Sequence, residues 1–219
     1  MIFVNFKTYQ ESTGERGLSL LNILGEVAGT TSVPIIPVVS ILDLAYFSGK
    51  TLLPLWVQHT DPFDYGAHTG FVLADEVFRL YGKGTFLNHS EHPISMRTLS
   101  LSVKKVKDTK LQSLVFAKDI ETLEKVIKLN PSYVSYEPPE LVGSTTTSVA
   151  SAKPEIISEA VEVSRKSGVP LVVGAGIHSK EDVSKSIELG AKGIAVATNI
   201  VKAQDPKASL LNLLEGFKK

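Results

Sequence analysis

The sequence contains no cysteine among its 219 residues. Without a thiol the chain can form no disulfide, no thiolate metal site and no cysteine nucleophile, and this composition fits a reducing compartment. No segment approaches the roughly 18 consecutive apolar residues of a membrane span, and the apolar residues 2–4 are too few for the core of a secretory signal. We therefore expect a cytoplasmic protein that does not associate with membranes.

The chain also lacks an excess of charge of either sign, since 23 lysines and arginines balance 23 aspartates and glutamates. A neutral chain has no overall positive field to attract phosphate backbones, so nucleic acid is not an expected partner. Apolar residues are abundant, because 43% of the chain is hydrophobic and 21% is charged. A chain of this length and composition can bury a full hydrophobic core and is typical of globular proteins.

Short apolar runs with strand-forming residues recur along the chain, and we predict a strand at each of them. Several, such as residues 33–38 and 171–173, are apolar almost throughout, as in parallel sheets covered by helices on both faces. The predicted strands span residues 2–5, 33–38, 52–58, 85–88, 113–116, 133–136, 171–173 and 193–196.

Between most of these runs the apolar residues have helical spacing. Asp119 is a candidate N-cap for a helix whose apolar face includes Leu123. A second helix begins near Pro154 and ends before Gly168, and a third follows Ser179. The chain therefore consists of repeated strand–helix units of similar length.

Eight strands that alternate with helices, without a linker-like stretch, predict a single α/β domain over residues 1–219 with the architecture of a closed (β/α)8 barrel. An open doubly wound sheet is the alternative, because both folds are built from right-handed βαβ units. The chain is short for a barrel, so we expect the helices after the second and fourth strands to be brief.

In a parallel barrel the loops that follow the strands meet at one face, so polar residues at strand ends are candidates for a functional site. Glu137 directly follows the apolar strand 133–136, where partial burial would raise its pKa toward that of a general base. His89 ends the fourth strand among three further polar residues, and such a group is costly to bury without purpose. Taken singly, these residues also have structural explanations, and Lys7 after the first strand could be a solvated lysine.

Small residues follow the seventh and eighth strands. Gly174 and Gly176 lead into a helix, where glycine lets backbone amides approach an anion. Ala197 and Thr198 end the eighth strand in a similar way. Barrels often build phosphate sites from the loops after strands seven and eight, so phosphate is the anion we expect. A tight strand-to-helix turn is the alternative explanation of the two glycines.

The segment 137–151 combines two prolines with a tip of small polar residues that begins at Gly143. We predict a hinged lid here, with an ordinary long surface loop as the alternative. His59 and His68 have no carboxylates at the spacing of a ligand set, so we predict no metal site.

Several motifs, in one order along essentially the whole chain, resemble the triosephosphate isomerase family in its short archaeal form. Their occurrence together is far more specific than any one of them. The motifs are NxK at residues 5–7, QHTDPFDYGAHTG at 58–70, NHSE at 88–91, EPPELVG at 137–143, GAGI at 174–177 and AVATNIVKAQDP at 195–206.

The resemblance implies a TIM barrel that interconverts dihydroxyacetone phosphate and D-glyceraldehyde 3-phosphate, in glycolysis and gluconeogenesis, without a metal or cofactor. The family pairs a glutamate base with a neutral histidine, and the resemblance assigns these roles to Glu137 and His89. Glu137 would move a proton between two carbons, and His89 would be the electrophile at the carbonyl oxygen. Lys7 and Asn5 would bind the substrate and stabilise the enediolate, and Glu91 would hold this group in place.

The resemblance also implies the contacts to the substrate phosphate. Val142 would line the closed lid, and closure would keep water away from an enediolate that can otherwise lose its phosphate. The residues that would bind the phosphate through backbone amides are Gly143 in the lid, Gly174, Gly176, Ala197 and Thr198.

The stretch from Tyr65 to Gly70 resembles the family's third loop, whose tip enters the active site of a neighbouring subunit. A homo-oligomer follows, with a tetramer favoured and a dimer as the alternative. The chain differs from the common family pattern at His92, where arginine is frequent, and at Asn199, where glycine is usual. Two other functions stay open: another phosphate-binding isomerase barrel, and a barrel that binds a phosphorylated metabolite without turnover.

Overall fold

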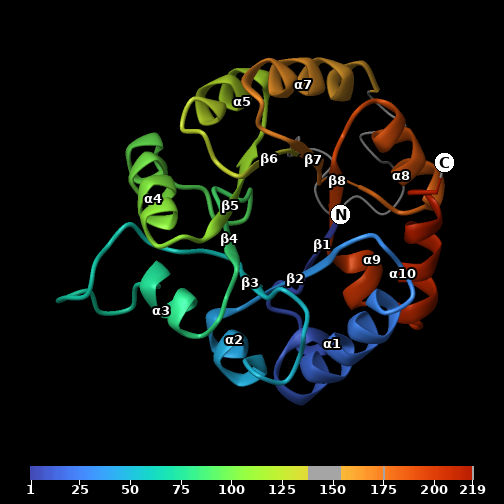
Figure 1. Ribbon diagram of the computed structural model, residues 1–219, viewed down its shortest axis with the longest axis horizontal. Coiled ribbons are helices and arrows are strands. Elements are labelled where there is room, and N and C mark those ends of the chain that lie inside the picture. The colour runs from blue at the N-terminus through green and yellow to red at the C-terminus, as the bar shows by residue number, and fades with distance from the viewer. Residues whose placement is uncertain (138–153, 175, 219) are drawn as a thin grey trace.

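The computed structural model of the chain describes residues 1–137, 154–174 and 176–218. Within them, parallel strands form a closed barrel in the order of the sequence, and the helices surround it (Figure 1). The strands are β1 (Ile2–Asn5), β2 (Ile35–Val39), β3 (Trp56–Val57), β4 (Gly84–Leu87), β5 (Gln112–Ala117), β6 (Tyr133–Tyr136), β7 (Leu171–Val173) and β8 (Gly193–Val196).

The helices fill the connections between these strands. None of those in the described part of the chain is long and apolar enough to cross a membrane. They are the 3-10 helix η1 (Gln10–Ser12) and the α-helices α1 (Gly14–Ala28), α2 (Ile41–Phe47), α3 (Ala74–Arg79), α4 (Met96–Asp108), α5 (Ile120–Ile127), α7 (Pro154–Ser167), α8 (Lys180–Glu188), α9 (Thr198–Val201) and α10 (Pro206–Glu215).

The barrel confirms the predicted fold class, and pairing of β1 with β8 closes the sheet that an open architecture would leave with free edges. The predicted bounds of β1, β6, β7 and β8 agree with the structure. The third strand is much shorter than predicted, because Pro54 has no N–H for a strand ladder and the apolar Leu52 is fully exposed.

The expectation of two brief helices is half wrong. The helix α2 has 7 residues, as expected, but α4 after the fourth strand has 13. The helix α3 is also short, with 6 residues, because much of the connection between β3 and β4 forms a loop that extends away from the barrel (Figure 1). The length of the chain limits the total amount of helix but does not determine which helices are short.

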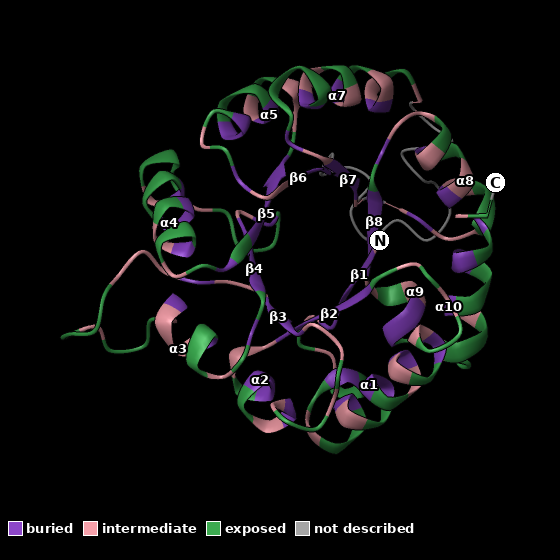
Figure 2. Cartoon of the chain, in the orientation of Figure 1, coloured by how far each residue is buried: buried purple, intermediate pink, exposed green. Residues whose placement is uncertain are grey.

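Strand alternation divides the core into two layers. Side chains on the inner face of the barrel include Phe3, Trp56 and Phe86, with the Phe3 and Trp56 rings packed edge to face at 5.0 Å. The other face of each strand packs against the buried stripes of the surrounding helices, which are exposed on their outer sides (Figure 2). Because alternate residues share a face, Tyr133 and Ser135 point inward, and the same alternation carries Glu137 toward the barrel axis.

Candidate active site

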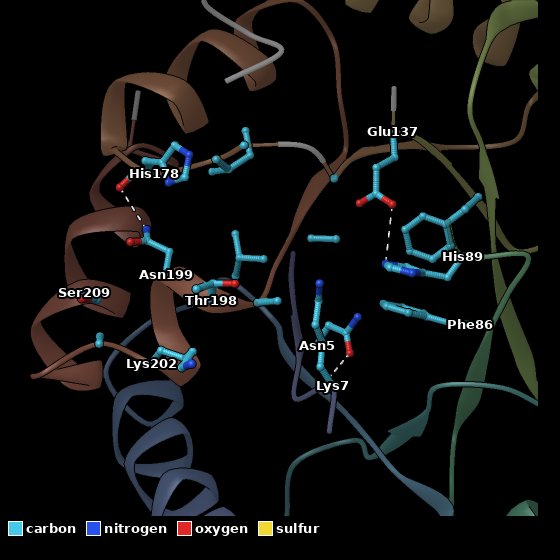
Figure 3. A pocket seen from close by; sticks show the side chains of 18 of the residues that line it. Asn5, Lys7, Phe86, His89, Glu137, His178, Thr198, Asn199, Lys202 and Ser209 are labelled. Carbon is cyan, nitrogen blue, oxygen red and sulfur yellow. Dashed lines mark hydrogen bonds and ion pairs between the residues drawn. The ribbon is translucent and has the colours of Figure 1, made fainter. Parts of the chain in front are cut away.

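A cavity of about 520 Å³ opens at the carboxyl ends of the strands. Figure 3 shows that Glu137, His89, Lys7 and Asn5 face one another on one side of it, while Thr198 and Asn199 lie on the other. The predicted site residues that line the cavity come from five strand ends: Asn5, Lys7, His89, Glu137, Gly174, Gly176, Ala197 and Thr198.

Lys7 is held in a strained backbone conformation at the end of β1. Its φ is +49°, which is rare for a residue with a side chain. Two side chains fix this turn, since the Lys7 N–H donates to Oδ1 of Asn5 at 3.0 Å and Gln58 Nε2 donates to the Lys7 carbonyl at 2.8 Å. The Lys7 ammonium reaches the cavity and pairs with Oε1 of Glu91 at 2.6 Å.

The orientation of His89 is set by a second residue with a left-handed backbone conformation, Asn88. Asn88 has φ of +58°, so the chain leaves the strand alternation directly after β4. Its side chain donates to the carbonyl of Phe116 at 3.0 Å and accepts from the N–H of Ile94 at 3.1 Å, which ties the turn to β5 and to the segment before α4. The imidazole of His89 then packs edge to face on Phe116, with ring centroids 4.7 Å apart.

The hydrogen bonds of His89 define its protonation. Nδ1 accepts from the backbone N–H of Glu91 at 3.1 Å, so the neutral ring carries its proton on Nε2. Burial lowers the pKa of His89 to about 4, while the Glu91 carboxylate opposes that shift and the Lys7 ammonium adds to it. At neutral pH the site therefore holds an uncharged imidazole with an N–H directed into the cavity.

Glu137 is almost completely buried, with 6% of its surface exposed. Its Oε2 accepts a hydrogen bond from Ser90 Oγ at 3.2 Å and lies 3.5 Å from Nε2 of His89. Burial raises the pKa of Glu137 to about 7, although the Ser90 hydrogen bond and the Lys7 charge each act to lower it. A carboxylate with this pKa can take up and return a proton near neutral pH, as a general base must.

Small residues from the loops after β7 and β8 form another part of the cavity wall. Gly176 has φ of +63°, a conformation that favours glycine. Gly174, which also lines the cavity, lies beside Glu137, because a Cβ added to it would be 3.0 Å from Oε1 of that residue. Ala197 and Thr198 lie where β8 passes into α9, and Thr198 Oγ1 is 3.2 Å from the hydroxyl of Tyr9. This part of the cavity can accommodate a compact anion close to the backbone.

The structure thus brings eight of the predicted site residues to one cavity and places Glu91 beside it, paired with Lys7. The lid residues Val142 and Gly143 lie outside the described residues. Sequence reasoning missed Gln58, the donor to the Lys7 turn, and did not single out Ser90 as the donor to Glu137. Gln58 could have been found, since it is also a polar residue at a strand end.

Lys202 is a further cation that the sequence did not single out. It lines the cavity on the α9 side, and its ammonium lies 5.0 Å from the ring centroid of Tyr9 (Figure 3). Within the described ranges, no three His, Asp or Glu residues are grouped as a metal site would require.

Comparisons with known proteins agree with this geometry. The model of the triosephosphate isomerase family matches residues 1–216. The triosephosphate isomerase of Methanothermus fervidus is 39% identical over 216 residues, which cover 98% of this chain and 97% of that protein. The enzyme of Metallosphaera sedula is 39% identical over 99% of this chain and 95% of its own length, and that of Archaeoglobus fulgidus is 34% identical over 98% and 96%. The chain belongs to the triosephosphate isomerase family.

Proposed function

We propose that this protein interconverts dihydroxyacetone phosphate and D-glyceraldehyde 3-phosphate, as the names of its relatives suggest. The observation that carries the proposal is the meeting of a buried carboxylate and a neutral imidazole, Glu137 and His89, 3.5 Å apart in one cavity with the Lys7 ammonium. Such a set can move a proton between adjacent carbons without a metal or cofactor.

In this proposal Glu137 takes a proton from the carbon next to the substrate carbonyl and returns it to the former carbonyl carbon, while a proton passes from the hydroxyl oxygen to the former carbonyl oxygen through Nε2 of His89. Nε2–H of His89 donates to the carbonyl oxygen as it gains charge, and the Lys7 ammonium stabilises the enediolate. Asn5 holds the Lys7 turn through its Oδ1. Glu91 fixes the ammonium by the 2.6 Å ion pair while leaving two of its N–H groups for the substrate.

The substrate phosphate is proposed to lie against the backbone of the loops after β7 and β8. Its partners there would be the amides of Gly174, Gly176, Ala197 and Thr198, all of which line the cavity. Val142 and Gly143 would complete the enclosure from the lid and exclude water, which protects the enediolate from loss of phosphate.

We further propose a cytoplasmic enzyme that forms a single domain and assembles as a homo-oligomer, a tetramer rather than a dimer. The absence of cysteine supports a reducing compartment. The projecting stretch from Tyr65 to Gly70 supports assembly, because Tyr65 and the adjacent Phe71 are 63% and 50% exposed.

A coupled spectrophotometric assay with each triose phosphate tests the reaction, with Glu137→Gln as the diagnostic variant. We expect turnover by the native protein and a loss of about 1,000-fold in kcat for the variant, because the amide cannot act as a base. Glu124→Gln, an exposed position on α5, is the matched control and should keep full activity. Stabilisation by phosphoglycolate without any turnover would instead indicate a barrel that only binds phosphorylated metabolites.

A further inference from the structure

A buried hydroxyl beside the proposed base has no hydrogen-bond partner. Ser135 on β6 is fully buried, and its Oγ contacts no donor or acceptor at bonding distance in the described part of the chain. Most buried hydroxyl groups are paired, because an unsatisfied one loses its bonds to water without replacement. The hydroxyl of Ser135 therefore requires an explanation that packing does not supply.

Strand geometry brings this hydroxyl close to the carboxylate of Glu137. The two residues are two positions apart on the inward face, and Ser135 is in register with Val172 of the neighbouring β7. A Cβ added to Gly174 would lie 2.9 Å from Ser135 Oγ and 3.0 Å from Oε1 of Glu137. Both atoms thus border the same small space, which is open because residue 174 is glycine.

The carboxylate has an oxygen that matches this donor. Oε2 accepts from Ser90 and faces His89, whereas Oε1 accepts no hydrogen bond from any residue that the structure describes. Each carboxylate oxygen has two lone pairs, and in the proposed reaction the carboxylate turns Oε2 away from Ser90 toward the substrate carbon. A rotation of the carboxyl group that frees Oε2 would turn Oε1 within the space that Gly174 leaves open.

We infer that Ser135 is a positioning residue for the base: its hydroxyl donates to Oε1 of Glu137 once the carboxylate leaves Ser90 to reach the substrate. The carboxylate then keeps one hydroxyl donor throughout the reaction. The bond from Ser135 replaces the one from Ser90 and holds the plane of the carboxylate in the reactive orientation. The rate of proton transfer depends on this orientation. The inference rests on the proposed isomerase function of this site.

The other groups that face Glu137 cannot take this role. His89 is 3.5 Å from Oε2, the opposite oxygen. Lys7 and Glu91 act on Glu137 through their charges, in opposite directions, and the two N–H groups that the 2.6 Å pair leaves on Lys7 are assigned to the substrate. Ser135 is thus a neutral donor that has no hydrogen-bond partner in the described part of the chain and borders the same space as Oε1.

The test is the pH dependence of kcat for Ser135→Ala, measured with the native protein as reference. The profile of kcat reports groups in the enzyme–substrate complex, and that of kcat/KM reports the free enzyme. A hydrogen bond to the charged carboxylate lowers its pKa, so losing the bond should move the acidic limb of kcat upward by about one pH unit. The acidic limb of kcat/KM should not move, because the bond is not formed in the free enzyme.

Ser102→Ala is the matched control. Ser102 on α4 is also fully buried with an unpaired hydroxyl, but unlike Ser135 it is not among the atoms that surround the space at Gly174 beside Glu137. Both variants should unfold at similar denaturant concentrations, and only Ser135→Ala should change the kcat profile and lower kcat, by about fivefold. Ser135→Cys keeps the volume with a weak donor and should behave as Ser135→Ala does.

Two results would overturn the inference: a native kcat profile in Ser135→Ala, or an equal change in Ser102→Ala. If the proposed function is wrong, the native protein itself shows no turnover, and this result is distinct from both of the results above. If Ser135→Ala fails to fold, the profile of Ser135→Cys decides the question on its own.

Discussion

A buried carboxylate is useful to catalysis and harmful to stability for the same reason. Burial raises the pKa of Glu137 from 4.5 to about 7, so the folded protein binds this proton more tightly than the unfolded chain does. Stability linked to Glu137 is therefore highest at low pH, falls as the pH rises through 4.5 to 7, and levels off above that. His89 acts in the opposite sense, because its pKa is lowered to about 4 and stability falls as the pH drops below 6.5.

We therefore expect Glu137→Gln to be more stable than the native protein at pH 8, by up to about 3 kcal/mol. The amide keeps the shape of the side chain and can still accept from Ser90, but it has no charge to bury. The gain should shrink as the pH falls and vanish near pH 4.5. Urea unfolding of both proteins from pH 5 to 8 measures it, and the contribution of His89 cancels because both proteins contain it.

A constant stability difference across this range would contradict the expectation, since it would mean that the charge of Glu137 costs nothing on folding. The variant that loses activity in the coupled assay should thus be the more stable protein above neutral pH. That combination is expected of a residue whose burial serves chemistry rather than folding.

At the scale of elements, the turn after β4 links catalysis to the barrel wall. Asn88 bridges the carbonyl of Phe116 and the N–H of Ile94 from a left-handed backbone conformation. Asparagine tolerates this conformation better than most residues with a side chain. The turn carries both His89 and Ser90, so its geometry sets the positions of the proposed electrophile and of the donor to Glu137 together.

Asn88→Ala should lower stability by about 2 to 3 kcal/mol and kcat by about tenfold, because it removes two hydrogen bonds and adds backbone strain. Asn88→Gly separates these causes, since glycine accepts the positive φ but makes neither bond. We expect the glycine variant to recover part of the stability and little of kcat. Urea unfolding and the coupled assay measure the two quantities, and identical values for both variants would show that the backbone conformation is unimportant.

The strands could be predicted from the sequence where the apolar residues of the pattern are also the buried ones. β1, β6, β7 and β8 have the predicted bounds because polar or turn residues stop each apolar run. The third strand was overpredicted because Leu52 is apolar yet exposed, and no single-sequence pattern distinguishes such a residue from a buried one. The positions of Asn5, Lys7, His89 and Glu137 on one cavity follow from the barrel itself, which gathers strand ends at one face.

The contacts that tune the site were less accessible from sequence. Ser90 reaches Glu137 from another strand end, 47 positions earlier in the chain, and the pair forms only when the barrel closes. Ser135 and Glu137 border one space only because Gly174, at the end of the neighbouring β7, has no side chain. Periodicity assigns a residue to a face, but distances across the barrel mouth depend on the twist and register of all the strands.

For the whole molecule, a projecting loop and a second cavity predict how copies of the chain assemble. The loop is closed at its base by Asp61 and Val72, and Phe63 stacks on His68 at 4.4 Å within it. It extends away from the ring of helices (Figure 1). Beside the catalytic cavity lies a second one of about 500 Å³, which shares Lys7 with it. In the proposed homo-oligomer, a loop tip from a partner subunit fills this second cavity and holds the Lys7 turn from outside.

Assembly and activity should therefore fall together when the loop is shortened. Replacing residues 65–70 by two glycines should convert the proposed oligomer to monomers in sedimentation equilibrium and lower kcat by at least about tenfold, because the Lys7 turn would lose its outer support. Tyr81→Asp, which changes a residue that is 76% exposed after α3, is the control for surface alteration and should leave both unchanged. A native protein that sediments as a fully active monomer would refute the link, since the second cavity would then need no partner to complete the site.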